Sequence, residues 1–197
     1  MNASAVLART LERIDEFRCI TADDLPHLME WRNRQQSVLR QEAPLSLEDQ
    51  ARWWTESVAP SYVAEKPQIM LLACDRGHGI SSYGGLTNID WTHLRAEVSF
   101  LAETELAKDL ARYSSELHQS LTIYASLAFD QFGLRRLHTE TWGFRNRHIA
   151  HLEDFGFRPE GRLRQHVVKE GRPVDAIIHG LLADDWARHD SARTGYG

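Results

Sequence analysis

The chain has 197 residues, a length that suits one α/β domain. Apolar residues make up 42% of it, which excludes a disordered protein and allows a substantial core. The net charge of −5 argues against a sequence-independent nucleic-acid binder, since such proteins normally carry a basic surplus. No apolar run reaches the roughly 18 residues that a membrane span requires, so we expect no membrane partner.

The N-terminal residues alternate small and charged side chains and lack the apolar core of a signal peptide, which predicts a cytoplasmic protein. Cys19 and Cys74 lie in apolar runs, as buried free thiols do, and two cysteines make no disulfide framework. The histidines share no ligand spacing. His148 and His151 are three residues apart, but no carboxylate-bearing zinc motif surrounds them, so we expect no metal.

The N-terminal third predicts one strand and several helices. Residues 1–15 read as an amphipathic helix or an arm, and 16–20 alternate as a strand does. Ser or Thr followed three residues later by Asp marks two helix starts, at Thr21 and at Ser46. We expect the second of these helices to end before Pro60.

The rest of the chain alternates strands with helices. The continuous apolar run at 69–74 is typical of a central strand buried on both faces. Helical periods at 114–132 and 147–155 are each followed by a glycine that suits a C-terminal cap. Shorter patterns predict five further strands, at 83–91, 96–101, 137–142, 161–169 and 173–182.

This order mixes hairpins with one or two crossovers, which favours an α+β (mixed α/β) fold, a sheet covered by helices. We predict a single domain over 16–190, preceded by the arm or helix at 1–15 and followed by a flexible tail at 191–197.

Three collinear stretches carry a family resemblance: YGGLTNIDWTHLRAEVSFL from Tyr83, ASLAFDQFGLRRLHTETW from Ala125, and RNRHIAHLEDFGFRPEGRLR from Arg145. They resemble the Gcn5-related acetyltransferase (GNAT) superfamily. The early WRN and the Trp53-Trp54 pair resemble its subgroup of ribosomal-protein and amino-sugar N-acetyltransferases. The resemblance implies a central, mostly antiparallel twisted sheet of about six to seven strands, flanked by helices. It also implies acetyl transfer from acetyl-coenzyme A (acetyl-CoA) to a primary amine.

The resemblance also implies a donor site. Backbone groups of Val98, Ser99, Phe100 and Leu101 should face the pantetheine arm. The family's phosphate motif aligns with residues 112–117, so the candidates there are Arg112, Tyr113, Ser114 and Ser115. Ser115 and Leu117 replace the motif's small residues, and the alternative is that Ser114 or Ser115 simply caps a helix. Asn146 lies one step from the position where the family often has Asn.

For the chemistry, the resemblance points to Glu97 as general base. The alternative is a structural Glu97 paired with Arg95 or Arg136. The family's tyrosine that protonates the departing thiolate is replaced by Leu152, which leaves Tyr113, Tyr124 and His148 as candidates, or a thiolate that leaves unaided.

The acceptor is the least determined part. Trp31, Arg32 and Glu140 are candidates for binding it. We favour a small-molecule amine, with a nucleotide-linked amino sugar first, over a protein N-terminus or lysine. A non-catalytic acyl-CoA-binding module is the alternative from another class, and exposed sheet edges at the C-terminal hairpin would allow a homodimer.

Overall fold

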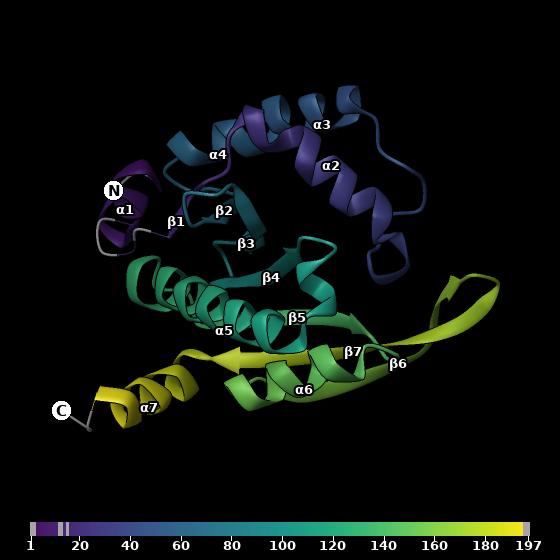
Figure 1. Cartoon of the computed structure of the whole chain (residues 1–197). Coiled ribbons are helices and arrows are strands. Elements are labelled where there is room, and N and C mark those ends of the chain that lie inside the picture. The colour runs from purple at the N-terminus through teal and green to yellow at the C-terminus, as the bar shows by residue number, and fades with distance from the viewer. Residues whose placement is uncertain (1–2, 12–13, 15, 195–197) are drawn as a thin grey trace.

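The computed structural model describes residues 3–11, 14 and 16–194 and joins seven strands of this part in one sheet (Figure 1). The strand order is β1-β2-β3-β4-β5-β7-β6. Neighbours are antiparallel except for β4 and β5, which are parallel because α5 crosses over between them. The strands are β1 (Phe17–Cys19), β2 (Met70–Asp75), β3 (Ile80–Asp90), β4 (Arg95–Ala102), β5 (Arg136–Trp142), β6 (Arg158–Lys169) and β7 (Arg172–Leu182).

Helices cover both faces of this sheet. Figure 1 shows α2, α3 and α4 on one side and α5 and α6 on the other, with the long β6–β7 hairpin projecting from the body. The α-helices are α1 (Ala3–Leu11), α2 (Leu25–Arg34), α3 (Leu47–Trp53), α4 (Ala59–Val63), α5 (Leu110–Ser126), α6 (Asn146–Phe155) and α7 (Ala183–Thr194). Short 3-10 turns are η1 (Ala22–Asp24), η2 (Gln36–Val38) and η4 (Leu106–Lys108), and π turns are η3 (Trp54–Val58) and η5 (Leu127–Gln131).

Two apolar cores form because side chains alternate across the sheet. On the α5 face, Leu72 and Val98 pack with Leu117 of α5. On the α2 face, Leu71 and Tyr83 pack with helix residues such as Leu28, Trp31 and Val58. The central strands therefore need apolar residues at every position, which is why β2 reads as a continuous apolar run.

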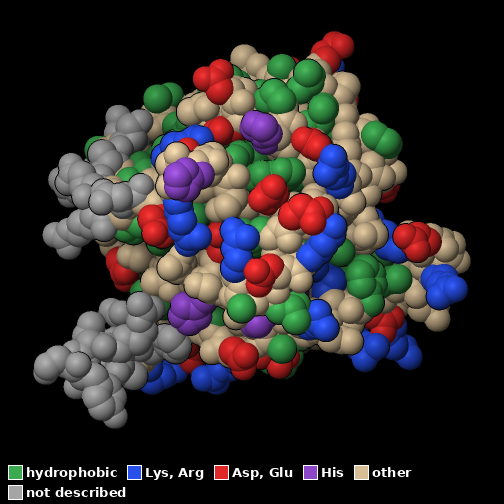
Figure 2. Space-filling model, in the orientation of Figure 1, with side chains coloured by type: hydrophobic (Ala, Val, Ile, Leu, Met, Phe, Trp, Pro, Cys, Tyr) green, Lys and Arg blue, Asp and Glu red, His purple; other side chains and the backbone are tan. Residues whose placement is uncertain are grey.

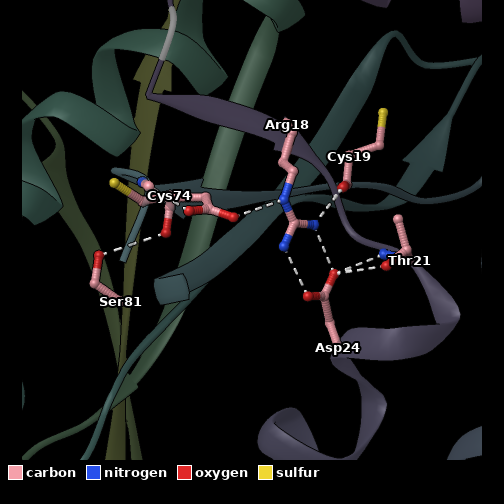
Figure 3. A network of polar contacts seen from close by, with 8 residues as sticks. Arg18, Cys19, Thr21, Asp24, Cys74 and Ser81 are labelled. Carbon is pink, nitrogen blue, oxygen red and sulfur yellow. Dashed lines mark hydrogen bonds and ion pairs between the residues drawn. The ribbon is translucent and has the colours of Figure 1, made fainter. Parts of the chain in front are cut away.

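An ion network fastens the edge strand β1 (Figure 3). Arg18 donates to both carboxylate oxygens of Asp24, at 2.7 and 2.8 Å, and to Asp75 at the end of β2, at 3.0 Å. Asp24 also accepts from the N–H of Thr21, at 2.7 Å, which closes the predicted cap. The network joins β1, the start of α2 and the end of β2.

The parallel pair β4–β5 is short and then divides. Its register covers only Arg95–Arg136, Ala96–Leu137 and Glu97–His138. Beyond Glu97 the two strands diverge, so β4 stays paired with β3 on one side but not with β5 on the other. This division creates an opening in the middle of the sheet.

The predicted fold class and sheet are confirmed, and so are the caps at Thr21 and Ser46 and the left-handed Gly156 that ends α6. Pro60 does not end its helix, and that prediction was wrong. The π turn η3 widens the helix just before it, where the N–H of Ala59 reaches the carbonyl of Trp54, so that the ring is accommodated.

Two boundaries were also predicted wrongly. The long helix begins at Leu110 rather than Ser114, because the side chain of Asp109 caps it. The tail predicted for 191–197 starts inside α7, which continues to Thr194, and its last three residues lie outside the described part. On the α1 side, the predicted arm or helix is a helix from Ala3 to Leu11.

Candidate active site

Three adjoining cavities lie around the division of β4 from β5. The central cavity, about 220 Å³, lies between Glu97, Glu140 and Arg145. The helix-start cavity, about 440 Å³, is lined by residues such as Leu101, Tyr113 and Asn146, and it shares Val38, Arg145 and His148 with the central one. The Trp53 cavity, about 380 Å³, lies on the α2 face and shares Arg32, Thr87 and Ser99 with the central one.

Glu97 lines the central cavity and is the last residue of β4 that pairs with β5. Its side chain is 13% exposed. Asn88 of β3 donates to Oε2 at 2.8 Å, and Arg40 forms an ion pair with both oxygens. The sequence alternative named Arg95 or Arg136 as its partner, and that prediction was wrong. Arg95 pairs with Asp90 and Arg136 with Glu160.

Arg40 reaches the cavity from the segment between η2 and α3. Its guanidinium also lies 3.6 Å from Glu140, and His166 of β6 lies 3.5 Å from the same carboxylate. The Lys169 ammonium donates to the carbonyl of Leu39, just before Arg40, and lies 5.7 Å from the ring of Trp142. The β6–β7 hairpin thus holds the segment that brings Arg40 to the site.

A tyrosine and a histidine meet where the central and helix-start cavities join. The Tyr113 hydroxyl lies 2.8 Å from His148 Nδ1, and Arg145 donates to that hydroxyl at 3.5 Å. Burial raises the pKa of Tyr113. Burial, followed by the charges of Arg145 and His151, lowers the pKa of His148 well below its ordinary value. Both side chains are therefore neutral at pH 7.

The start of α5 borders the helix-start cavity through Leu110. Asp109 accepts from the N–H of Arg112 at 3.2 Å, and the carbonyl of Asp109 accepts from the N–H of Tyr113 at 2.9 Å. The N–H groups of Leu110 and Ala111 are the ones at the free end of the helix.

The structure distributes the predicted donor residues in three ways. Val98, Ser99 and Phe100 line the central cavity, and Leu101, Tyr113 and Asn146 line the helix-start cavity. By contrast, Arg112, Ser114 and Ser115 line none of the three cavities. The last two lie inside α5, where Ser114 contacts His151 at 3.4 Å. Neither serine caps the helix, because Asp109 does so.

Of the predicted acceptor residues, Arg32 and Glu140 line the central cavity. Trp31 is a core residue. It is 6% exposed, and its ring lies 6.5 Å from that of Tyr83. Trp53, of the family-like Trp53-Trp54 pair, lines the cavity on the α2 face instead.

Sequence reasoning missed several residues that line these cavities: Arg40, Gln50, Thr139 and, as a buried cation, Arg145. Burial lowers the pKa of Arg145, which the nearby Tyr113 hydroxyl partly offsets. Arg40, Gln50 and Thr139 belong to no recognisable motif, whereas Arg145 begins the third stretch of the family resemblance. One signal in the sequence could have indicated some of these cavity residues: polar residues inside an otherwise apolar strand, such as Thr139 and Thr141 of β5.

No group of three or more His, Cys, Asp or Glu side chains among the described residues is placed to hold a metal ion. None of the helices in that part of the chain is long and apolar enough to cross a membrane. On the face that Figure 2 shows, acidic and basic side chains are intermingled rather than separated by sign.

Solved structures of polyamine acetyltransferases have this fold. The spermidine N-acetyltransferase from Vibrio cholerae in complex with CoA and spermine matches with a TM-score of 0.74 at 16% identity, over 87% of this chain and 96% of that one. Mutant forms of the spermidine/spermine N-acetyltransferase SpeG from the same organism match with a TM-score of 0.72 at 15% identity, over 89% and 99%.

A search of curated proteins found no match. A model of the acetyltransferase (GNAT) domain family matches residues 17–178, which is most of the chain and includes all seven strands of the sheet except the end of β7. The predicted superfamily and enzyme class are thereby confirmed, whereas the subgroup of ribosomal-protein and amino-sugar enzymes stays a prediction. The chain belongs to the GNAT family of acetyltransferases.

Proposed function

We propose that this protein transfers the acetyl group of acetyl-CoA to the primary amine of a small molecule, at the division between β4 and β5. One observation carries the proposal. Glu97, a carboxylate, lies in a cavity that opens on one side to a helix start and on the other to a separate, partly aromatic cavity. A two-substrate reaction needs this arrangement, because donor and acceptor must reach one base from different sides.

The helix-start cavity fits the donor. Its walls include Leu110 and Phe144, and the unpaired side of β4 at Leu101 offers backbone groups to an amide arm. Helix N-termini attract phosphate, and α5 begins here. Arg145 and Arg147 add positive charge in the same cavity. We therefore assign phosphate binding to the N–H groups of Leu110 and Ala111 and to these arginines rather than to Ser114 and Ser115.

Glu97 is the proposed general base. An amine arrives as an ammonium and must lose a proton before its nitrogen can form a bond to the thioester carbonyl carbon. Glu97 accepts that proton, directly or through water, and releases it to solvent. The neutral nitrogen then bonds to the thioester carbon, and Glu97 accepts its second proton as the carbon–sulfur bond breaks. Asn88 and Arg40 hold the carboxylate in place until the acceptor arrives.

The departing sulfur receives the Nε2 proton of His148 while the Tyr113 hydroxyl gives its proton to Nδ1, and solvent afterwards returns a proton to the tyrosinate. When Nδ1 of His148 accepts from the Tyr113 hydroxyl, Nε2 carries the ring's proton and is a donor. This pair takes the role that the family's missing tyrosine leaves open at Leu152. A thiol is fairly acidic, so this help is worth less than that of the base.

A small acceptor suits the cavity on the α2 face. Side chains from α2, α3, β2, β3 and β4 surround it, whereas a protein N-terminus or a lysine side chain would require an open groove for the flanking peptide. A nucleotide-linked amino sugar stays within this class. The spermine of the Vibrio cholerae complex is also a small amine and is one candidate acceptor to assay.

The test is an assay of thiol release from acetyl-CoA against a panel of amines, for the wild type and for Glu97→Gln. We expect turnover with at least one amine and a decrease of kcat by about 100-fold or more in the variant at neutral pH. An unchanged kcat would remove Glu97 from the mechanism. Donor binding without turnover for any amine would favour the non-catalytic acyl-CoA-binding module.

A further inference from the structure

Arg32 is a cation without an acidic partner at the boundary of two cavities. It extends from α2 and lines both the central and the Trp53 cavity. Its Nη1 donates to the Tyr83 hydroxyl at 3.3 Å, and no acidic side chain of the described residues forms an ion pair with it. Two residues later, Arg34 pairs with Glu30 at 2.7 Å and lies 59% exposed. A partly buried guanidinium that lines a cavity and has no acidic partner can bind the anionic group of a ligand.

Gln50 provides a second, independent sign of a ligand in the same place. The residue is 4% exposed, lines the Trp53 cavity, and its Oε1 has no hydrogen-bond partner. A buried carbonyl oxygen without a donor costs free energy, and a ligand N–H or O–H would remove that cost.

Most of the remaining wall of the Trp53 cavity is apolar or aromatic; Asp49 also lines it, but its carboxylate already accepts from Ser46 and Arg52. Leu45, Trp53, Ile69 and Tyr83 contribute to this wall, and the volume is about 380 Å³. Such a wall accommodates a compact body rather than a long flexible chain of charges. Glu97 is reached from this side past Arg32, Thr87 and Ser99.

We infer that the acceptor carries an anionic group in addition to its amine, and that Arg32 binds this group. The inference rests on the proposed function. The amine faces Glu97, the carboxylate or phosphate lies against Arg32, and a donor on the acceptor's body faces Gln50. A linear polycation has no group for Arg32 and is repelled by it.

The experiment compares kcat/KM for matched amines that differ in the anion: phenylalanine with phenethylamine, glucosamine 6-phosphate with glucosamine, and spermidine as the polycation. We expect the anionic member of at least one pair to be favoured, and the favoured pair distinguishes carboxylate from phosphate. Arg32→Gln should lower kcat/KM for that anionic member by about 10- to 100-fold, mostly through KM, and change its neutral analogue by less than about threefold.

Arg32→Lys should restore part of the loss, and Arg34→Gln, on the same helix but outside both cavities, should change neither amine. Thermal stability with acetyl-CoA verifies that each variant is folded and binds the donor. Preference for neutral amines or spermidine, or an equal loss for both members in Arg32→Gln, overturns the inference and leaves the proposed function standing. If no amine of the panel is acetylated although acetyl-CoA binds, both fail.

Discussion

The guanidinium of Arg40 and the carboxylate of Glu97 form a two-pronged ion pair in the central cavity, with Arg40 Nη1 3.3 Å from Glu97 Oε2. The two residues are 57 positions apart. Arg40 is half exposed, so the pair can open at small cost. In the proposed mechanism the acceptor's ammonium approaches Glu97 at this place, so we expect Arg40 to compete with the acceptor for Glu97.

Replacing Arg40 should make the site easier to enter. We expect Arg40→Gln to lower KM for the amine by about three- to fivefold with little change in kcat, since an exposed ion pair is worth up to about 1 kcal/mol. Steady-state kinetics at fixed acetyl-CoA give both constants. Arg158→Gln, which removes an ion pair with Asp185 outside the three cavities, is the control. A higher KM in Arg40→Gln would mean that Arg40 binds the acceptor instead of competing with it.

Removing the hydroxyl of Tyr113 should slow the reaction less than removing the carboxylate of Glu97. We expect Tyr113→Phe to lower kcat by about 10-fold and to leave KM for the amine unchanged, because a thiolate leaves readily even without a donor. Single-turnover acetyl transfer measures the chemical step directly. A loss as large as that of Glu97→Gln, or none at all, contradicts the assigned role.

Gly84 is where β3 approaches β4 too closely for any side chain. A Cβ atom at this position would lie 2.1 Å from the carbonyl oxygen of Ser99, a residue of the central cavity. Gly84→Ala should therefore lower the free energy of unfolding by about 3 kcal/mol, because backbone must move. At the equivalent change Gly161→Ala, in β6, nothing lies within 4 Å, and we expect less than about 0.5 kcal/mol. Urea unfolding of both variants decides the matter, and equal stabilities would refute it.

Asp24 should make the fold sensitive to acid. Burial raises its pKa, but the Arg18 guanidinium and the Thr21 N–H outweigh burial and hold the pKa of Asp24 below its ordinary value. A carboxyl with a lowered pKa stabilises the fold fully above its unfolded pKa of about 4, and this contribution is lost as the pH falls through the folded value.

We therefore expect Asp24→Asn to lower the free energy of unfolding by about 2 kcal/mol at pH 7 and by progressively less below pH 4. Urea unfolding across this range measures the difference. Asp23→Asn, next to it but exposed, is the matched control and should stay within about 0.5 kcal/mol of the wild type. A deficit that persists unchanged at low pH would exclude the ionised pair as its cause.

Short-range signals made the fold predictable. The caps at Thr21 and Ser46 depend on a contact over three residues, and Gly156 ends α6 through its own backbone angle. The wrong predictions concern helix ends that depend on residues outside the local pattern. Pro60 would break a helix whose preceding turn is a regular α turn. Here the preceding turn, η3, is a wider π turn, so the helix continues. Asp109 caps α5 from a loop whose course no periodicity specifies.

The candidate site was most predictable where it coincides with a strand, although the predicted helix residues Arg32, Tyr113 and Asn146 also line the cavities. Glu97 and residues 98–101 follow from the position of β4, and they lie at the cavities as expected. Arg40 does not, because the β6–β7 hairpin places it through Lys169, which is 130 positions from its contact at Leu39. Gln50 likewise reads in sequence as an ordinary helix residue, and only its burial without a partner marks it.

The most direct test of the donor site is the thermal stability of the wild-type protein with acetyl-CoA, with dephospho-CoA and ADP for comparison. At a hundred times its Kd, a ligand of the native state adds about 2.7 kcal/mol, which raises the Tm of a chain of this size by about 5 to 10 °C. We predict such a shift with acetyl-CoA and a smaller one with ADP, which lacks the arm that lies along β4. No shift at millimolar acetyl-CoA would contradict the account, because the division between β4 and β5 would then hold no donor.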